Sequence, residues 1–187
     1  MSVALVLGGG QTLWSDLRAA LDLGEYGGVV ACNDAGVYWP GPLDGWCSLH
    51  ADRLAMWMEA RRRRGYPPPG SAFGHADARR AYPKLVDRLT GFVEFRFPGQ
   101  KSSGSSGHFA LKVALVELGF DKAVLCGVPM DGNPHFFDRH GWSASDSHWA
   151  GWGESLPLIR DRVRSMSGRT RELLGIPTPD WIGASAS

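Results

Sequence analysis

One histidine stands in a segment whose composition suits acid–base chemistry. His148 lies in the run Ser145-Asp-Ser-His-Trp-Ala-Gly-Trp152, which mixes polar and aromatic residues. An imidazole can take a proton from a hydroxyl group near neutral pH, and a carboxylate such as Asp146 can orient it. The neighbouring tryptophans could stack on a ring or shield a reaction from water. A surface histidine packed against tryptophans gives the same pattern, so both interpretations stay open.

A glycine-rich turn, Gly8-Gly9-Gly10-Gln11-Thr12, follows the first apolar segment of the chain. Small residues at the start of a helix leave backbone N–H groups free for an anion, which the helix dipole also favours. The turn has neither the complete dinucleotide fingerprint nor the lysine of a P-loop. It therefore predicts either a phosphate-binding turn or a tight turn without a ligand.

Polar or small residues also follow other predicted strands or precede a predicted helix. They are Asn33, Asp34, His50, Ser105, Ser106, Gly107 and Asp131. An asparagine amide can bind a base or ribose by paired hydrogen bonds, although Asn33 and Asp34 are also ordinary turn residues. Ser105-Ser106-Gly107 offers hydroxyl and N–H groups to a second anion or sugar, whereas the preceding Ser-Ser-Gly could be a flexible linker.

Two further clusters of ionisable residues match neither a metal site nor a nucleic-acid-binding surface. His135, His140 and His148 lie near Asp131 and Asp138, but no spacing matches a known zinc pattern, so we expect no metal site. The run Arg61-Arg62-Arg63-Arg64 is typical of a solvated helix C-terminus. It has too few basic neighbours for a nucleic-acid patch, and we do not expect nucleic acid as a partner.

The elements that must position these residues alternate between short apolar runs and segments of helical spacing. The predicted strands are Val3 to Leu7, Gly28 to Cys32, Trp46 to Leu49, Phe92 to Phe97 and Ala123 to Cys126. Helices are predicted after Thr12, which is placed to cap the first one, after His50, at about His108 to Leu118 and at Glu154 to Leu174. Residues 65–89 are expected to be irregular, and residues 132–153 to form a long loop.

This alternation predicts an α/β domain with a mostly parallel central sheet and helices on both faces, a Rossmann-like arrangement. Ligands of such sheets bind beyond the carboxyl ends of the strands. The glycine turn, Asn33, His50 and Asp131 all follow predicted strands, so they are expected to meet there. We expect a single nucleotide-binding domain over residues 1–176 and a tail over 177–187 whose end is frayed.

Length and composition agree with one globular domain. The chain has 187 residues, of which 43% are hydrophobic and 21% charged, with a net charge of +1. No apolar run approaches the roughly 20 residues that span a bilayer, and the N-terminal segment lacks the pattern of a signal peptide. We therefore expect a cytoplasmic protein with no membrane partner, in which Cys32, Cys47 and Cys126 are reduced and buried.

Several segments occur in an order that resembles a known family. The chain resembles the bacterial sialyltransferases with a single modified Rossmann-like domain, together with uncharacterised phage and prophage proteins that share their motifs. The matching segments are Leu7-Gly-Gly-Gly-Gln-Thr12, Cys32-Asn33, Ser105-Ser106-Gly107, Leu118-Gly119-Phe120, Gly127-Val-Pro-Met-Asp131 and Asp146-Ser147-His148-Trp149. Their order and spacing follow the family from about Val3 to Leu174. Gly9 stands where the family has asparagine, and Gln11-Thr12 where it has Pro-Ser.

The resemblance implies a function and roles for these residues. The glycine turn, Asn33 and the Ser105–Gly107 turn would bind a cytidine nucleotide-sugar, and His50 would lie near a further nucleotide contact. His148 would act as the base on an acceptor hydroxyl, without a catalytic metal or another cofactor. The leading expectation is a metal-independent glycosyltransferase-like enzyme. The alternatives are a metal-dependent pyrophosphokinase-like enzyme, with Asp34 or Asp131 as ligands, and a phage accessory protein that binds a nucleotide without catalysis.

Overall fold

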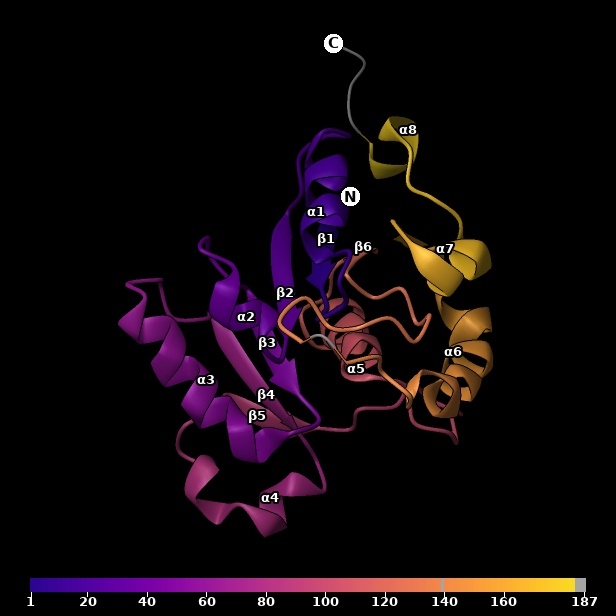
Figure 1. Ribbon diagram of the computed structural model, residues 1–187. Helices are drawn as coiled ribbons and strands as arrows, with labels where there is room; N and C mark the ends of the chain where they lie inside the picture. The colour runs from indigo at the N-terminus through magenta and orange to yellow at the C-terminus, as the bar shows by residue number, and fades with distance from the viewer. Residues whose placement is uncertain (139, 184–187) are drawn as a thin grey trace.

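A parallel sheet forms the centre of the protein. The computed structural model describes residues 1–138 and 140–183, and the sheet within these residues has the strand order β5-β4-β3-β2-β1-β6-β7. The strands are β1 (Val3–Leu7), β2 (Gly28–Cys32), β3 (Gly45–Ser48), β4 (Ser71–His75), β5 (Gly91–Val93), β6 (Lys122–Cys126) and β7 (Val163–Ser165). All neighbouring strands are parallel, which confirms the predicted Rossmann-like α/β fold (Figure 1).

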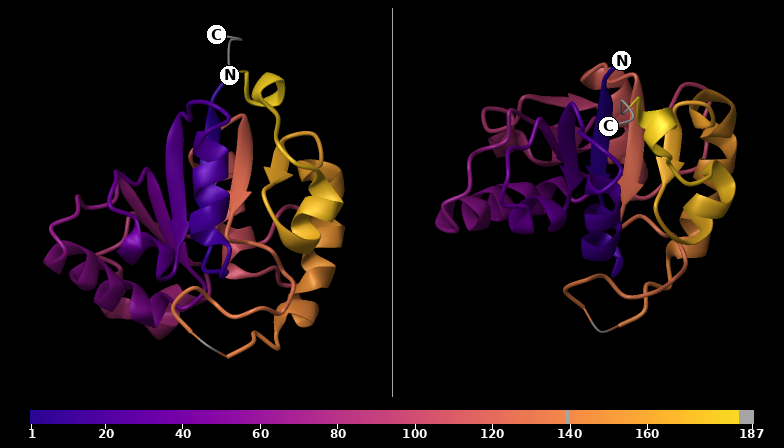
Figure 2. Two further views of the ribbon diagram at one scale, coloured as in Figure 1. Left: turned by 45° about the horizontal axis from the view of Figure 1, so that its top comes forward. Right: turned by 90° about the horizontal axis from the view of Figure 1, so that it is seen from above.

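Helices cover both faces of the sheet (Figure 2). One face packs against α1 (Leu13–Leu21), α2 (Ala35–Tyr38) and α3 (Ala51–Arg63). The other packs against α5 (Ser106–Lys112), which continues as a π-helix over Val113–Glu117, and against α6 (Ser145–Ile159). The shorter helices are α4 (Ala78–Ala81), a 3-10 turn (Pro83–Leu85), α7 (Gly168–Leu174) and α8 (Pro179–Ile182). Within the described residues, no helix is long and apolar enough to cross a membrane.

Strand β1 shows why both faces are covered. Its side chains alternate, so that Val3, Leu5 and Leu7 enter the core beneath α1 whereas Ala4 and Val6 enter the core beneath α5. All five are buried. A strand that is apolar at every position is stable only between two layers of helices, which is the usual state of a parallel sheet.

The C-terminal part of the chain is organised differently from the prediction. Helix α6 begins at Ser145, so the second half of the predicted loop is helical. The predicted helix from Glu154 to Leu174 is divided into the end of α6, strand β7 and helix α7. Val163 has the spacing of a helical core residue, yet it lies in β7 and pairs with β6. An edge strand of three residues is too short to show an alternating pattern of its own.

A strand also forms in the segment that was expected to be irregular. Strand β4 has the sequence Ser-Ala-Phe-Gly-His and pairs with β3. Strand β5 spans Gly91–Val93, so it includes only the first two residues of the strand predicted at Phe92 to Phe97. Alanine and glycine have low strand propensity, so pairing with β3 and burial decide this segment rather than its local pattern. The predicted tail is partly folded too, because α8 places Ile182 in a core. The expected fraying at 184–187 lies outside the described residues.

The arginine run is not uniformly solvated, because Arg61 is buried. Its guanidinium donates hydrogen bonds to the carbonyl oxygens of Gly36, Trp39, Gly41 and Pro67, at distances of 2.5–2.7 Å. These bonds fasten the end of α3 to α2 and the segment after it, and to the turn that follows α3. The expectation of a solvated run holds for the next two residues, which pair with Glu59 at the surface.

The helix that carries the Ser105–Gly107 turn is buried and includes one buried imidazole. His108 Nε2 lies 2.8 Å from the Ser155 hydroxyl, and the ring makes edge contacts with Trp152 and Phe97. Burial lowers the pKa of His108 from 6.5 to about 3, because the charged form would lose its hydration. His108 therefore joins α5 to α6 as a neutral side chain.

We predict that the free energy of unfolding decreases as the pH is lowered from 6.5 to about 3. The variant His108→Gln should show a weaker dependence on pH. The unfolded imidazole binds a proton near pH 6.5 whereas the folded one stays neutral, so stability present above pH 6.5 is lost as the pH is lowered. Urea unfolding of both proteins at several pH values measures the slope. His140→Gln, a change at an exposed position, should keep the wild-type slope. An unchanged slope in His108→Gln would contradict the prediction.

Candidate functional site

A pocket of about 210 Å³ lies at the carboxyl ends of β1, β2, β3 and β6. Ten of the residues singled out in the sequence line it: Gly8, Gly9, Gly10, Asn33, His50, Ser105, Ser106, Gly107, Asp131 and His148. Gln11, Thr12, Asp34 and Asp146 are not among the lining residues. Nine further residues line the pocket without having been predicted for the site: Cys32, Leu49, Gly127, Val128, Pro129, Met130, Asn133, His135 and Trp142.

The glycine turn after β1 packs against the turn after β6. The N–H groups of Gly8 and Gly10 donate to the carbonyl oxygens of Cys126 and Gly127, each at 2.8 Å, and Gln11 N–H donates to the Pro134 carbonyl. These N–H groups are therefore not free for a phosphate, which corrects the expectation for this part of the turn. A Cβ at Gly8 would lie 2.4 Å from the Gly127 carbonyl oxygen, so the glycine is required by backbone packing.

Thr12 does not cap α1, and its side chain serves a different contact. The hydroxyl lies 2.8 Å from Asp16 Oδ2 and 2.9 Å from the Ser167 hydroxyl. Asp16 is buried and also accepts hydrogen bonds from Ser167 Oγ at 2.6 Å and from Gly127 N–H at 2.9 Å. A buried carboxylate needs such partners, because its lost hydration must be replaced. Asp16 therefore fixes the turn after β6, a role that its position within a helical pattern concealed.

Asn33 is both a turn residue and a residue that lines the pocket. Its φ of 48° is the left-handed conformation that a turn asparagine tolerates. It also lines the pocket, where its Oδ1 accepts a hydrogen bond of 2.7 Å from Ser48 Oγ. With Oδ1 engaged, the amide offers its N–H donors to a ligand. The next residue, Asp34, precedes α2 instead, and burial raises the pKa of its carboxyl.

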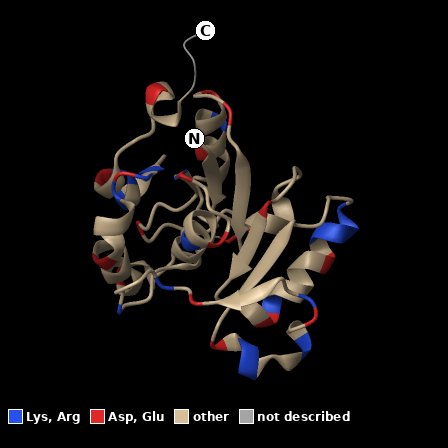
Figure 3. Ribbon diagram, turned by 180° about the vertical axis from the view of Figure 1, so that it is seen from behind, with Lys and Arg blue, Asp and Glu red and all other residues tan. Residues whose placement is uncertain are grey.

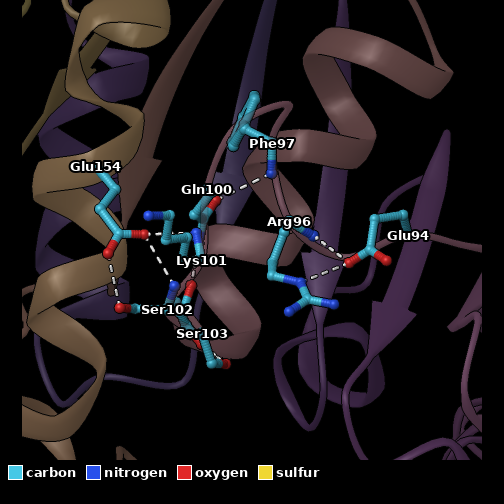
Figure 4. A network of polar contacts seen from close by, with 9 residues as sticks. Glu94, Arg96, Phe97, Gln100, Lys101, Ser102, Ser103 and Glu154 are labelled. Atoms are coloured by element: carbon cyan, nitrogen blue, oxygen red, sulfur yellow. Dashed lines mark hydrogen bonds and ion pairs between the residues drawn. The ribbon is translucent and has the colours of Figure 1, made fainter.

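The segment before α5 is anchored and is not a flexible linker (Figure 4). Glu154 of α6 accepts hydrogen bonds from the N–H groups of Lys101 and Ser102 and from the Ser102 hydroxyl, at 2.7–2.8 Å. These bonds to the charged form lower the pKa of the Glu154 carboxyl. Gln100 adds hydrogen bonds to Phe97 N–H and to the Ser102 carbonyl. The Ser105–Gly107 turn is therefore held against the pocket from the α6 side.

His148 lies in the first turns of α6 rather than in a loop, and it faces the pocket. Its ring stacks on Trp142, with centroids 5.7 Å apart and an angle of 22° between the planes. Nδ1 is buried and has no hydrogen-bond partner within the described structure. Asp146, expected to orient this histidine, is exposed and instead binds Arg169. His148 is thus positioned by stacking and not by that carboxylate.

The segment before α6 closes the pocket from a third side. His135 forms an isolated antiparallel bridge with Gly10, and Phe136 N–H donates to the Gly9 carbonyl at 3.0 Å. Asp131 turns the chain at the start of this segment, because its carboxylate accepts from the backbone N–H and the side-chain amide of Asn133. Burial lowers the pKa of His135, which lines the pocket beside Trp142.

Charged residues are distributed unevenly between the pocket and the α3–α4 region. Three histidines and one carboxylate, Asp131, line the pocket, and no lysine or arginine is among the described lining residues. Residues 51–100 carry ten Lys and Arg against five Asp and Glu, and many of them lie along α3 and α4 (Figure 3).

In the part of the chain that the structure describes, no group of three His, Cys, Asp or Glu residues is placed to hold a metal ion.

Known structures show the same fold. No protein-family model and no curated protein matches the sequence. The chain is similar to the sialyltransferase CstII from Campylobacter jejuni in complex with CMP-3FNeuAc, with a TM-score of 0.61 and 12% identity over 100% of this chain and 89% of that chain. Cst-II with a trisaccharide acceptor and CMP gives 0.60 and 12%, and a Cst-II variant with CMP gives 0.62 and 13%, at the same coverage. The chain therefore has a sialyltransferase-like fold.

We predict that alanine destabilises the protein much more at Gly8 than at its neighbour Gly9. Gly8→Ala should lower the free energy of unfolding by about 1–3 kcal/mol, because the added methyl group meets backbone atoms. Gly9→Ala should cost much less, because its Cβ would meet only side chains, the nearest being His135 Cδ2 at 3.0 Å. Thermal unfolding followed by circular dichroism measures both. Equal losses of stability in the two variants would contradict the prediction that the backbone of the turn after β6 requires glycine at position 8.

Proposed function

We propose that the protein is a metal-independent glycosyltransferase that binds a nucleotide-sugar at the carboxyl ends of β1, β2, β3 and β6. The observation that carries the proposal is the convergence of ten residues, chosen from the sequence, on one pocket. The similar structures bind CMP or the analogue CMP-3FNeuAc, so we infer a cytidine nucleotide-sugar as the donor.

The charge of the pocket supports a donor with a single phosphate group. Nucleoside diphosphates carry several negative charges, which proteins usually balance with magnesium or with Lys and Arg clamps. The described lining offers His50, His135 and His148 instead, with N–H donors from Asn33 and the Ser105–Gly107 turn. A monophosphate diester carries one charge, which hydrogen bonds from these side chains and backbone N–H groups can accommodate.

In the proposed reaction, the acceptor hydroxyl oxygen attacks the anomeric carbon of the sugar. A carbon–oxygen bond forms there as the bond to the phosphate oxygen breaks, and the nucleotide leaves with both bonding electrons. His148 takes the hydroxyl proton as the attack proceeds. Its place against Trp142 at the wall of the pocket supports this role, because stacking holds the imidazole without a carboxylate.

A nucleotide-binding protein without catalysis is the second candidate. Two observations favour it: Asp146 binds Arg169, and His148 Nδ1 has no partner among the described residues. Enzymes commonly orient a catalytic histidine through the second ring nitrogen. Turnover of a nucleotide-sugar separates the two candidates.

We predict that CMP raises the melting temperature of the purified protein with or without magnesium. At 100 times the dissociation constant, one-site binding contributes about 2.7 kcal/mol to the free energy of unfolding. UMP, GMP and AMP under the same conditions serve as controls for base selectivity. A shift that depends on magnesium would favour pyrophosphokinase-like chemistry, and no shift with any nucleotide would remove the nucleotide from the proposal.

We further predict that His148→Gln lowers the rate of CMP release from a CMP-linked sialic acid in the presence of acceptor by about 10²–10⁴-fold. The CMP-induced thermal shift should persist, because the imidazole acts on the acceptor. Asp146→Asn is the matched control and should lose far less activity, since Asp146 binds Arg169 and does not orient His148. Unchanged turnover in His148→Gln would exclude its role as the base.

A further inference from the structure

Aromatic side chains gather beside the mouth of the pocket. Phe136 lies at their centre and makes edge contacts with Trp14, Tyr38 and Phe137, with ring centroids 5.1–5.7 Å apart. Phe137 in turn stacks on His135, with centroids 5.3 Å apart and planes at 12°. We name these five residues the aromatic row. The row begins at a residue that lines the pocket, because His135 belongs to both.

Three members of the aromatic row are exposed rather than packed in a core. The exposed fractions are 42% for Trp14, 37% for Tyr38 and 48% for Phe137. Among the Trp, Tyr and Phe side chains in the described part of the chain, only Tyr82 is exposed besides these three. Three elements distant in sequence supply the row, namely α1, α2 and the segment before α6. Grouped exposed aromatic rings next to a pocket are typical of a binding surface.

The chemistry of these rings suits a sugar. A pyranose ring has a face of C–H groups that packs on an aromatic ring, while its hydroxyl groups remain in water around the edge. A protein partner fits less well, since three partly exposed side chains fall short of the ~800 Å² per partner that a standard interface buries. A second copy of this chain is excluded as the preferred occupant for the same reason.

We propose that the aromatic row is the subsite for the sugar rings of an oligosaccharide acceptor. The inference rests on the proposed function for its direction: the donor would occupy the pocket, and the acceptor would reach it across His135. The Arg64 guanidinium lies 4.3 Å from the ring centroid of Tyr38 and holds the far end of the row. An acceptor of two or more sugars would thus extend from Phe137 towards Tyr38.

The test measures sugar binding without requiring transfer. Saturation-transfer difference NMR of the full chain, with CMP present, uses lactose, N-acetyllactosamine, cellobiose and chitotriose as probes. We expect saturation of the C–H protons of at least one probe, and about tenfold weaker binding in Phe137→Ala and in Trp14→Ala. Tyr82→Ala, which removes an exposed aromatic ring outside the row, should bind like the wild type.

The outcomes separate this inference from the proposed function. Sugar binding that depends on the row without any CMP-induced thermal shift would support the subsite and contradict the nucleotide-sugar donor. A CMP shift with no bound sugar, or with equal binding in Phe137→Ala and the wild type, would overturn the subsite alone. Loss of the CMP shift in Phe137→Ala would assign the row to the donor and overturn it too. The subsite proposal would also be overturned if light scattering showed that the wild type is a dimer and that Phe137→Ala converts it to a monomer.

Discussion

The backbone contact between the turns after β1 and β6 is the constraint on which the site depends. Gly8 and Gly10 approach the turn after β6 so closely that a Cβ at either position would overlap with it. Asp16 makes the approach possible, because its buried carboxylate binds Gly127 N–H and is itself satisfied by two hydroxyl groups. The floor of the pocket is therefore built from backbone, and it has little freedom to move.

Two irregular segments complete the pocket on this floor. Residues 100–107 are held by Glu154 of α6, and the segment around His135 pairs with Gly9 and Gly10. Both contacts join parts of the chain that are far apart in sequence. The arrangement follows a general pattern in which a rigid sheet positions loops that carry function. It brings His148 to the wall of the pocket, and it leaves an aromatic surface, including Phe137, at its mouth.

The sequence predicted the location of the site better than its contacts. Residues that directly follow the central strands, such as Gly8 and Asn33, do line one pocket. Thr12 and Asp34 were expected beside them but have other contacts, because side chains of consecutive residues at a strand end or helix start point in different directions. The N–H groups of the glycine turn were expected to be free, yet those of Gly8, Gly10 and Gln11 donate hydrogen bonds to Cys126, Gly127 and Pro134.

The sequence by itself determined the alternation of apolar strands and helices, and with it the parallel sheet and the edge at which the pocket lies. These features depend on local periodicity and on burial, which a single segment expresses. Tertiary structure decided the rest. Strands β4 and β7 exist because a neighbouring strand pairs with them. Asp146 pairs with Arg169 instead of His148, because residues two apart on one helix do not face each other. Hydrogen-bond partners and cross-strand pairs are choices between distant residues, and no local pattern encodes which partner is nearest.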